Sequence, residues 1–212
     1  MSGNEYLAPA DYGEATLVEK RSKFIARIWP VETEPDALAH LDAIRKQHRD
    51  ATHNVYAYII RNGPTRYSDD GEPQGTSGMP TLAVFQREAV CNVLCTVTRY
   101  YGGVLLGAGG LVRAYSTAAK LALDVAGVNI MREWNVILIP TAYSLFEQVR
   151  NLVHAHRGNI ASTEYGVDIL LEALIPRGTS ETFLTGLADL SSGTIEAEVV
   201  ATTFRGVLRD KR

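Results

Sequence analysis

Three carboxylates fall within four positions of a short, glycine-rich stretch. Residues 68–80 read SDDGEPQGTSGMP and include Asp69, Asp70 and Glu72. Carboxylates at this spacing could hold Mg²⁺ or act as an acid and a base. They could also accept backbone N–H groups of a rigid turn, which is the ordinary use of Asp beside Gly. We favour the structural role, because the spacing of a calcium loop is absent, and we expect no metal site and no cofactor.

A second glycine-rich stretch follows at residues 99–115, RYYGGVLLGAGGLVRAY. It is not a Walker A loop, because Ala108 and Gly109 stand where Lys and Ser/Thr are required. It is not a dinucleotide fingerprint either, because Val112 replaces the third glycine. A glycine loop that leads into a helix can still offer N–H groups to an anion, with Arg113 as a clamp. The alternative is that the glycines only allow tight turns and close packing.

No complete catalytic set emerges from the remaining polar residues. The chain lacks both G-x-S-x-G and H-E-x-x-H. His154 and His156 are two positions apart, so on a helix they face different directions. His53 opens an expected strand, where it could be catalytic or simply hydrogen-bonded. We predict no catalytic residues.

The cysteines and the charge narrow the class of protein. Cys91 and Cys95 lie in an apolar run typical of a buried strand, so we interpret both as small core residues. The net charge of −3 and the pI of 6.0 argue against a general nucleic-acid binder. Any RNA contact must use a local basic patch, for which residues 20–27 and 45–49 are the candidates. We favour the interpretation that each of these segments is simply a charged face exposed to solvent. Without a signal peptide or a long apolar run, we expect a cytoplasmic protein that contacts neither membrane nor DNA.

The first half of the chain mixes strands and helices. Thr33 is the expected N-cap of a helix that carries Leu38, Leu41 and Ile44 at 3.6-residue spacing. A second helix follows the glycine loop and ends before Gly127. Its expected buried face consists of Leu111, Tyr115, Ala118, Ala119, Ala122 and Val125. The expected strands are residues 23–31, 53–60, 81–85 and 90–98.

The second half has a different pattern. Strand and helix periodicities from residue 135 onward give the order β-α-β-β-α-β, which is that of a ferredoxin-like unit. We therefore predict an α+β protein of two domains, residues 1–134 and residues 135–212.

The two glycine-rich stretches together closely resemble the signature of the YigZ/IMPACT family. KRSKFIARI and DATHNVYAYI upstream also fit, so the resemblance covers most of residues 16–127, and residues 135–212 look like the smaller domain of bacterial members. The positions that match the family pattern are Asp69, Asp70, Gly71, Glu72, Pro73, Arg99, Gly102, Gly103 and Gly110.

The resemblance carries expectations about fold and function. It implies a left-handed βαβ first domain like domain IV of elongation factor G, followed by a ferredoxin-like domain. It also implies a regulator of translation that binds RNA, the ribosome or a translation-related protein. The surface expected to serve this binding consists of His53, Asp69, Asp70, Glu72, Arg99, Tyr100, Gly102, Gly103, Gly109, Gly110 and Arg113.

Two further expectations concern the glycine-rich stretches. One alternative function is an enzyme that acts on a nucleotide or another phosphorylated small molecule through the glycine loop. We also expect Asp69 or Asp70 to pair with Arg99, or to accept N–H groups near Gly102 and Gly103, because an isolated acidic cluster would repel itself.

Overall fold

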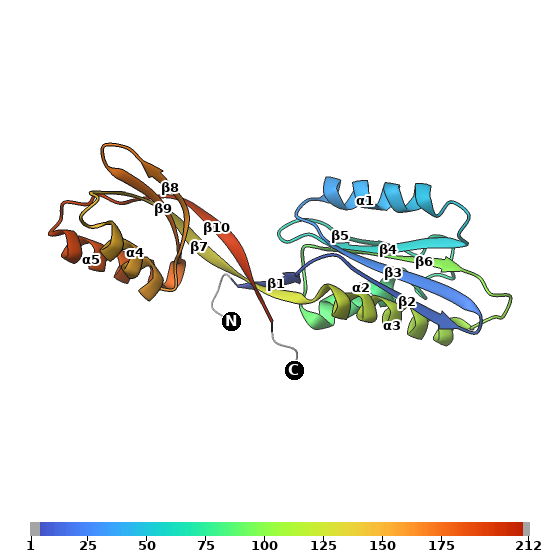
Figure 1. The fold of residues 1–212 in the computed structure, drawn as a ribbon. Coiled ribbons are helices and arrows are strands. Elements are labelled where there is room, and N and C mark those ends of the chain that lie inside the picture. The colour runs from blue at the N-terminus through green and yellow to red at the C-terminus, as the bar shows by residue number, and fades with distance from the viewer. Residues whose placement is uncertain (1–4, 210–212) are drawn as a thin grey trace. The chain divides into compact units, whose positions relative to one another are not determined.

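The protein forms two compact units with mixed helices and strands. The structure, a computed structural model, describes residues 5–209 (Figure 1). Of the described residues, the N-terminal unit comprises 6–130 and 206–209, and the C-terminal unit comprises 5 and 131–205. The predicted two-domain α+β class is confirmed. The predicted boundary at residue 134 stays a prediction.

A five-stranded antiparallel sheet organises the N-terminal unit. Its order is β2-β3-β6-β4-β5. Strand β6 lies between β3 and β4 and is antiparallel to both, so β3 and β4 are parallel and need a crossover connection. The strands are β2 (Gly13–Glu19), β3 (Ser22–Pro30), β4 (His53–Ile59), β5 (Thr65–Ser68) and β6 (Val93–Tyr100).

Helices cover both faces of this sheet. Helix α1 (Glu34–Gln47) makes the crossover and lies on one face, whereas α2 (Gly78–Glu88) and α3 (Ala108–Ala126) lie on the other (Figure 1). The larger core forms under α2 and α3 and includes Phe24, Phe85 and Val97. A smaller cluster under α1 includes Tyr58 and Leu94. One face of the sheet therefore carries most of the apolar packing.

The expected helix signals near residues 33 and 127 are present. Thr33 and Asp36 form a capping box at the start of α1. Gly127 caps α3 with a φ of +70°. One predicted core residue of α3 is wrong, because Val125 is 62% exposed whereas Ala126 is buried. The apolar face continues through residues 122, 123 and 126, which keeps the 3.6-residue period.

Two strand predictions in the middle of the chain need correction. Residues 81–85, expected as a strand, belong to α2. A short apolar run fits a buried strand and a buried helix equally well, and here Pro80 stands in the first turn of the helix. Strand β6 begins only at Val93, so Cys91 precedes it and is half-buried, while Cys95 is fully buried in the core as expected.

The C-terminal unit has the predicted element order β-α-β-β-α-β. Its sheet order is β10-β7-β9-β8, and β1 (Tyr6–Pro9) also pairs with β7. Apolar residues of α4 and α5 pack against this sheet around Ile137, Leu171 and Phe183. The elements are β7 (Val128–Thr141), α4 (Phe146–Ala155), β8 (Asn159–Tyr165), β9 (Ile169–Pro176), η1 (Arg177–Thr179), α5 (Ser180–Ser191) and β10 (Glu198–Leu208).

Among the described residues, no helix is both long and apolar enough to cross a membrane.

Candidate functional site

Asp69 folds the acidic loop onto the start of α2. Its carboxylate accepts N–H groups from Gly75 at 2.8 Å, Ser77 at 3.1 Å and Gly78 at 2.8 Å, and the Ser77 hydroxyl at 2.7 Å. Burial raises the pKa of the Asp69 carboxyl. The hydrogen bonds together lower this pKa by more than burial raises it, so the net pKa lies below the ordinary value. Asp69 is therefore an internal cap of the loop, which is the structural role that the sequence favoured.

Asp70 ties the same loop to the start of β4. Its carboxylate accepts the Asn54 N–H at 2.6 Å, and its carbonyl oxygen lies 2.7 Å from Nδ1 of His53. A carbonyl can only accept, so His53 donates from Nδ1. Asp70 has a φ of +45°, a left-handed conformation that Asp tolerates in turns. The side-chain and backbone bonds of Asp70 are thus both used inside the molecule.

Glu72 lies at the centre of a buried polar cluster. Its Oε1 accepts Nη1 of Arg99 at 2.6 Å and the Tyr115 hydroxyl at 2.7 Å. Nη2 of Arg99 donates to Oγ of Ser22 at 3.3 Å, and Nε2 of His53 lies 3.8 Å from the second Glu72 oxygen. Burial, with the neighbouring Glu72 charge, raises the pKa of the Tyr115 phenol well above its usual value. The cluster joins the acidic loop, β6, β4 and α3.

The expected partner of Arg99 was wrong. Neither Asp69 nor Asp70 reaches the guanidinium, and Glu72 takes this place. Arg99 follows Val97 by two positions on β6 and so points to the same inner face, under α3. The expected bond from the Gly102 N–H to Asp69 or Asp70 is also wrong, because this N–H donates to the Ser22 hydroxyl at 3.2 Å.

The glycine loop packs against the β2–β3 turn. A Cβ on Gly102 would lie 2.0 Å from the carbonyl carbon of Arg21, so only glycine fits there. Gly103 has a φ of +82°, and Leu105 beyond it is 81% exposed. A Cβ on Gly110 would lie 3.0 Å from that of Leu106. Close packing therefore requires glycine at position 102, whereas a side chain at position 110 would need only a small shift of Leu106.

The start of α3 is open. Gly107 is its N-cap residue and supplies no side-chain cap. The Arg113 side chain turns back toward the first turn, with Nη1 3.6 Å from where a Cβ of Gly109 would lie. Gly109 and Arg113 are both exposed. These two residues are close to one another, but they are not part of the Glu72 cluster.

Tyr100 belongs to a separate network on the α1 face of the sheet. Its hydroxyl lies 2.9 Å from Nδ1 of His48, whose Nε2 lies 3.0 Å from Nη2 of Arg27. Arg27 also pairs with Glu14 at 2.8 Å and is buried. Burial and the Arg27 charge lower the pKa of His48. Arg27 is thus a structural residue and not a member of an exposed basic patch.

The sequence reasoning missed several residues of these networks, among them Ser22, Asn54, Tyr115 and His48. Tyr115 carried a usable signal, because a tyrosine on the buried face of a helix needs a partner for its hydroxyl. For the others the sequence offered no such signal, since hydroxyls, amides and imidazoles are common on surfaces. Within residues 5–209, no group of three His, Cys, Asp or Glu residues is placed to hold a metal.

Two family models match the chain. The Impact N-terminal domain matches residues 20–123, and a domain of unknown function, DUF1949, matches residues 141–194. The IMPACT family member YvyE of Bacillus subtilis is 30% identical over 90% of this chain and 88% of its own length. The IMPACT family member YigZ of Escherichia coli is 32% identical over 90% of this chain and 96% of its own.

More distant and structural relatives agree with this assignment. Protein IMPACT-A of Xenopus tropicalis is 36% identical, but over 50% of this chain and 35% of its own length. A solved structure described as that of a hypothetical protein superimposes with a TM-score of 0.58 and 29% identity, over 93% of this chain and 98% of the other. The protein belongs to the IMPACT family.

Proposed function

We propose that this protein is a translation-associated regulator that acts by binding, with RNA, the ribosome or a translation factor as its partner. The contact is made by what we call the cationic end of the N-terminal unit. It is where the β2–β3 turn, the α1–β4 connection and the β6–α3 loop lie together (Figure 1). The exposed cations that define it are Lys20, Arg21, Lys23, Arg49 and Arg113.

One observation carries the proposal: the acids of the signature are used internally while the cations remain available. Asp69 accepts four hydrogen bonds within its own loop, and Glu72 is buried against Arg99. None of the five defining cations is ion-paired with another residue of the described range 5–209. A local positive surface therefore exists on a chain whose net charge is −3.

The family supports the regulatory part of the proposal. Eukaryotic IMPACT proteins match about half of this chain, and the Impact N-terminal domain model covers residues 20–123, which include the cationic end. The resemblance to this family implies a role in translation, and a cytoplasmic location is part of this proposal. No DNA or membrane contact is part of the proposal.

The test is sedimentation with ribosomes at low and at high salt. Lysine and arginine contacts to phosphate release counterions, so binding should be strong at low salt and fall steeply as salt rises. The triple variant Lys20→Gln, Arg21→Gln, Lys23→Gln should lose most of this binding. A matched control removes three cations elsewhere, at Arg66, Arg87 and Arg150, and should bind normally. Absence of co-sedimentation at both salts, together with absence of binding to structured RNA, would exclude RNA and the ribosome as partners.

One observation supports an alternative, which is an enzyme acting on a nucleotide or other phosphorylated small molecule. The start of α3 has no side-chain cap, and Arg113 lies over its first turn. Thermal unfolding with and without Mg²⁺ and ATP separates the two functions, because a ligand at 100 times its dissociation constant stabilises by ~2.7 kcal/mol. A shift that Arg113→Ala abolishes would favour the enzyme, and an unchanged melting temperature would favour the binding protein.

A further inference from the structure

Tyr101 presents an aromatic ring in the β6–α3 loop of the cationic end. It follows directly after β6, and its side chain is 45% exposed. The carbon of the Arg99 guanidinium lies over this ring, 5.4 Å from the ring centroid. The Tyr101 N–H donates to Oγ1 of Thr52 at 3.0 Å, which fixes the backbone. The ring thus lies against a guanidinium of the protein and remains partly open to solvent.

The plane beneath the ring is held rigidly by the buried cluster. Arg99 is only 5% exposed, and Glu72 and Ser22 fix its two terminal nitrogens. The same guanidinium carbon lies 5.3 Å from the centroid of the Phe24 ring. A guanidinium fixed on three sides restricts the ring stacked on it, so little conformational entropy is left to lose when a ligand binds. Glu72 and Arg99 are therefore positioning residues for Tyr101.

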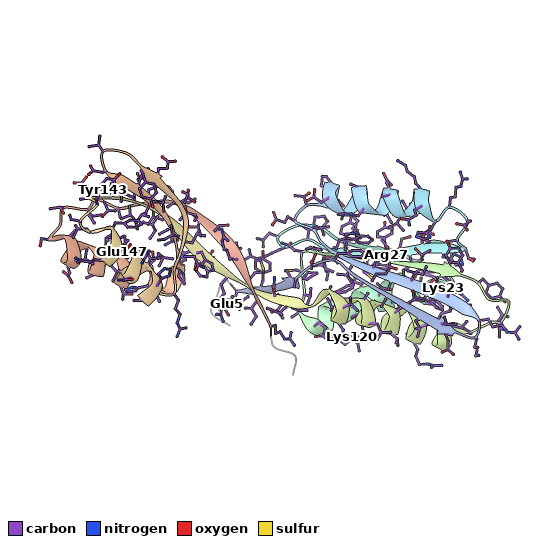
Figure 2. The ribbon with its side chains drawn as sticks, viewed as in Figure 1. Glu5, Lys23, Arg27, Lys120, Tyr143 and Glu147 are labelled. Carbon is purple, nitrogen blue, oxygen red and sulfur yellow. The ribbon has the colours of Figure 1, made fainter. Side chains whose placement is uncertain are left out.

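Two exposed cations lie in the turn that packs against the residue after Tyr101. The close packing of Gly102 on Arg21 sets the β2–β3 turn beside the backbone of Tyr101. The turn exposes Lys20 and Arg21. Lys23 is the register partner of Tyr100 and therefore lies on the α1 face, across the sheet from Arg99. In Figure 2 the Lys23 side chain lies toward this end of the sheet. An open aromatic ring with two exposed cations in the adjoining turn fits a ligand that has both a flat ring and negative charge.

We infer that Tyr101 stacks on an unpaired base of single-stranded RNA whose phosphates are neutralised by Lys20 and Arg21. Bases stack on aromatic side chains where a strand is unpaired, whereas in a duplex they are covered by their neighbours. A cationic ligand is disfavoured, because the ring already faces a guanidinium and lies among other cations. This inference rests on the proposed function and specifies its ligand.

The test uses the full chain and two RNAs of the same sequence, a labelled single-stranded 12-mer and its blunt duplex. Replacement of Tyr101 by Leu should weaken binding of the single strand roughly 5- to 150-fold, which is the effect of removing one stacked base. Tyr101→Phe keeps the ring and should bind within about threefold of the wild type. Neither change should alter duplex binding. A 2-aminopurine placed in the single strand should be quenched by the wild type and by Tyr101→Phe, but not by Tyr101→Leu.

A second measurement separates failure of the inference from failure of the proposed function. Removal of the Lys20 and Arg21 charges should reduce the salt slope of single-strand binding by about 0.7 for each lost phosphate contact. If the wild type binds RNA with this salt dependence but Tyr101→Leu binds equally well, stacking is overturned and the proposed function stands. If the wild type binds neither RNA nor ribosomes and instead binds a translation factor, the inference that RNA is the ligand is overturned. Unchanged melting temperatures of the variants would show that any loss is local.

Discussion

Glu72 and Arg99 form an ion pair of 2.6 Å in which both side chains are almost wholly buried. The two residues are 27 positions apart, in the acidic loop and at the end of β6. A buried charge is tolerated only when it is paired and hydrogen-bonded, and Tyr115 and Ser22 supply the additional bonds. The pair therefore locks the acidic loop to the sheet and, through Arg99, fixes Tyr101.

Removing either member of this pair should strongly destabilise the protein. Glu72→Gln or Arg99→Met leaves an uncompensated charge in the interior, which lowers the free energy of unfolding by about 3–5 kcal/mol. The double variant should lose less than the sum, with a coupling energy on the order of 0.5–3 kcal/mol. Urea unfolding of the wild type, both single variants and the double variant measures this coupling.

Asp70 provides the control for the double-mutant cycle of Glu72 and Arg99. Its carboxylate contacts the Asn54 N–H and does not contact Arg99. Asp70→Asn and Arg99→Met should therefore be additive within about 0.5 kcal/mol. A coupling of Asp70 to Arg99 as large as that of Glu72 would contradict the pairing in the structure.

Asp69→Asn should destabilise the protein by about 1–3 kcal/mol at pH 7, because an amide group cannot accept all four donors of the loop. The folded state holds the pKa of Asp69 below its ordinary value. The stabilisation is therefore fully present above the unfolded pKa of about 3.9 and is lost as the pH falls through the folded pKa.

Chemical unfolding at pH 7 and near pH 3 checks both statements. The difference between the wild type and Asp69→Asn should shrink at the lower pH. Asp42→Asn, on the exposed side of α1, is the control and should change stability by less than about 0.5 kcal/mol. An equal loss at the two pH values would show that the Asp69 charge is not the stabilising feature.

The sequence predicted the C-terminal fold well because each element there has its own clear period. Strands such as residues 169–176 alternate or are continuously apolar, and α5 ends at Ser191 before a glycine at residue 193. The prediction for the region of α2 was wrong because this region has no clear period. Its five apolar residues are too few to separate a strand from a helix, and contact with α3 and the sheet decides the outcome.

The candidate site could be predicted only in part. The sequence indicated that the acidic residues stabilise the loop and that one of them pairs with Arg99. It did not identify which of the three acidic residues forms this pair. Which one is buried depends on the turn at Asp70, whose positive φ directs the next residues under α3. The role of Tyr101 was not predicted, because it depends on contacts from Thr52 and Arg99 that only the folded sheet brings together.

Tyr58 should make the protein sensitive to alkaline pH. It is buried in the cluster under α1, and its hydroxyl donates to Oε1 of Glu34. Burial and the Glu34 carboxylate raise the pKa of Tyr58 to about 12. A raised folded pKa gives stability that is fully present below the unfolded value near 10 and is lost as the pH rises through the folded value.

Unfolding free energies measured between pH 8 and pH 11.5 test this. Tyr58→Phe should reduce the alkaline loss of stability by on the order of 1–2 kcal/mol. Tyr67→Phe, at an exposed position of β5, should leave the profile unchanged. A Tyr58→Phe profile parallel to that of the wild type would mean that other groups govern the alkaline transition.

Two glycines of the same loop should respond to alanine in opposite directions. At Gly102 the new methyl group would lie 2.0 Å from the Arg21 carbonyl carbon, which is backbone and cannot rotate away. Gly102→Ala should therefore destabilise by on the order of 2–4 kcal/mol and push the loop off the β2–β3 turn. Gly109 lies in the first turn of α3, where the nearest atom to a Cβ is Nη1 of Arg113 at 3.6 Å. Gly109→Ala should stabilise by about 0.5–1 kcal/mol, because alanine favours the helix and restricts the unfolded chain.

Thermal or urea unfolding of the two variants gives the signs, and the ribosome assay gives their consequence. Gly102→Ala should also weaken binding, since it separates Tyr101 from the cations of the turn, whereas Gly109→Ala should bind as the wild type does. If Gly109→Ala is more stable yet fails to bind, the partner approaches the backbone of the first turn of α3. The contact surface would then lie at that helix end, beside Arg113, and not at the Tyr101 ring.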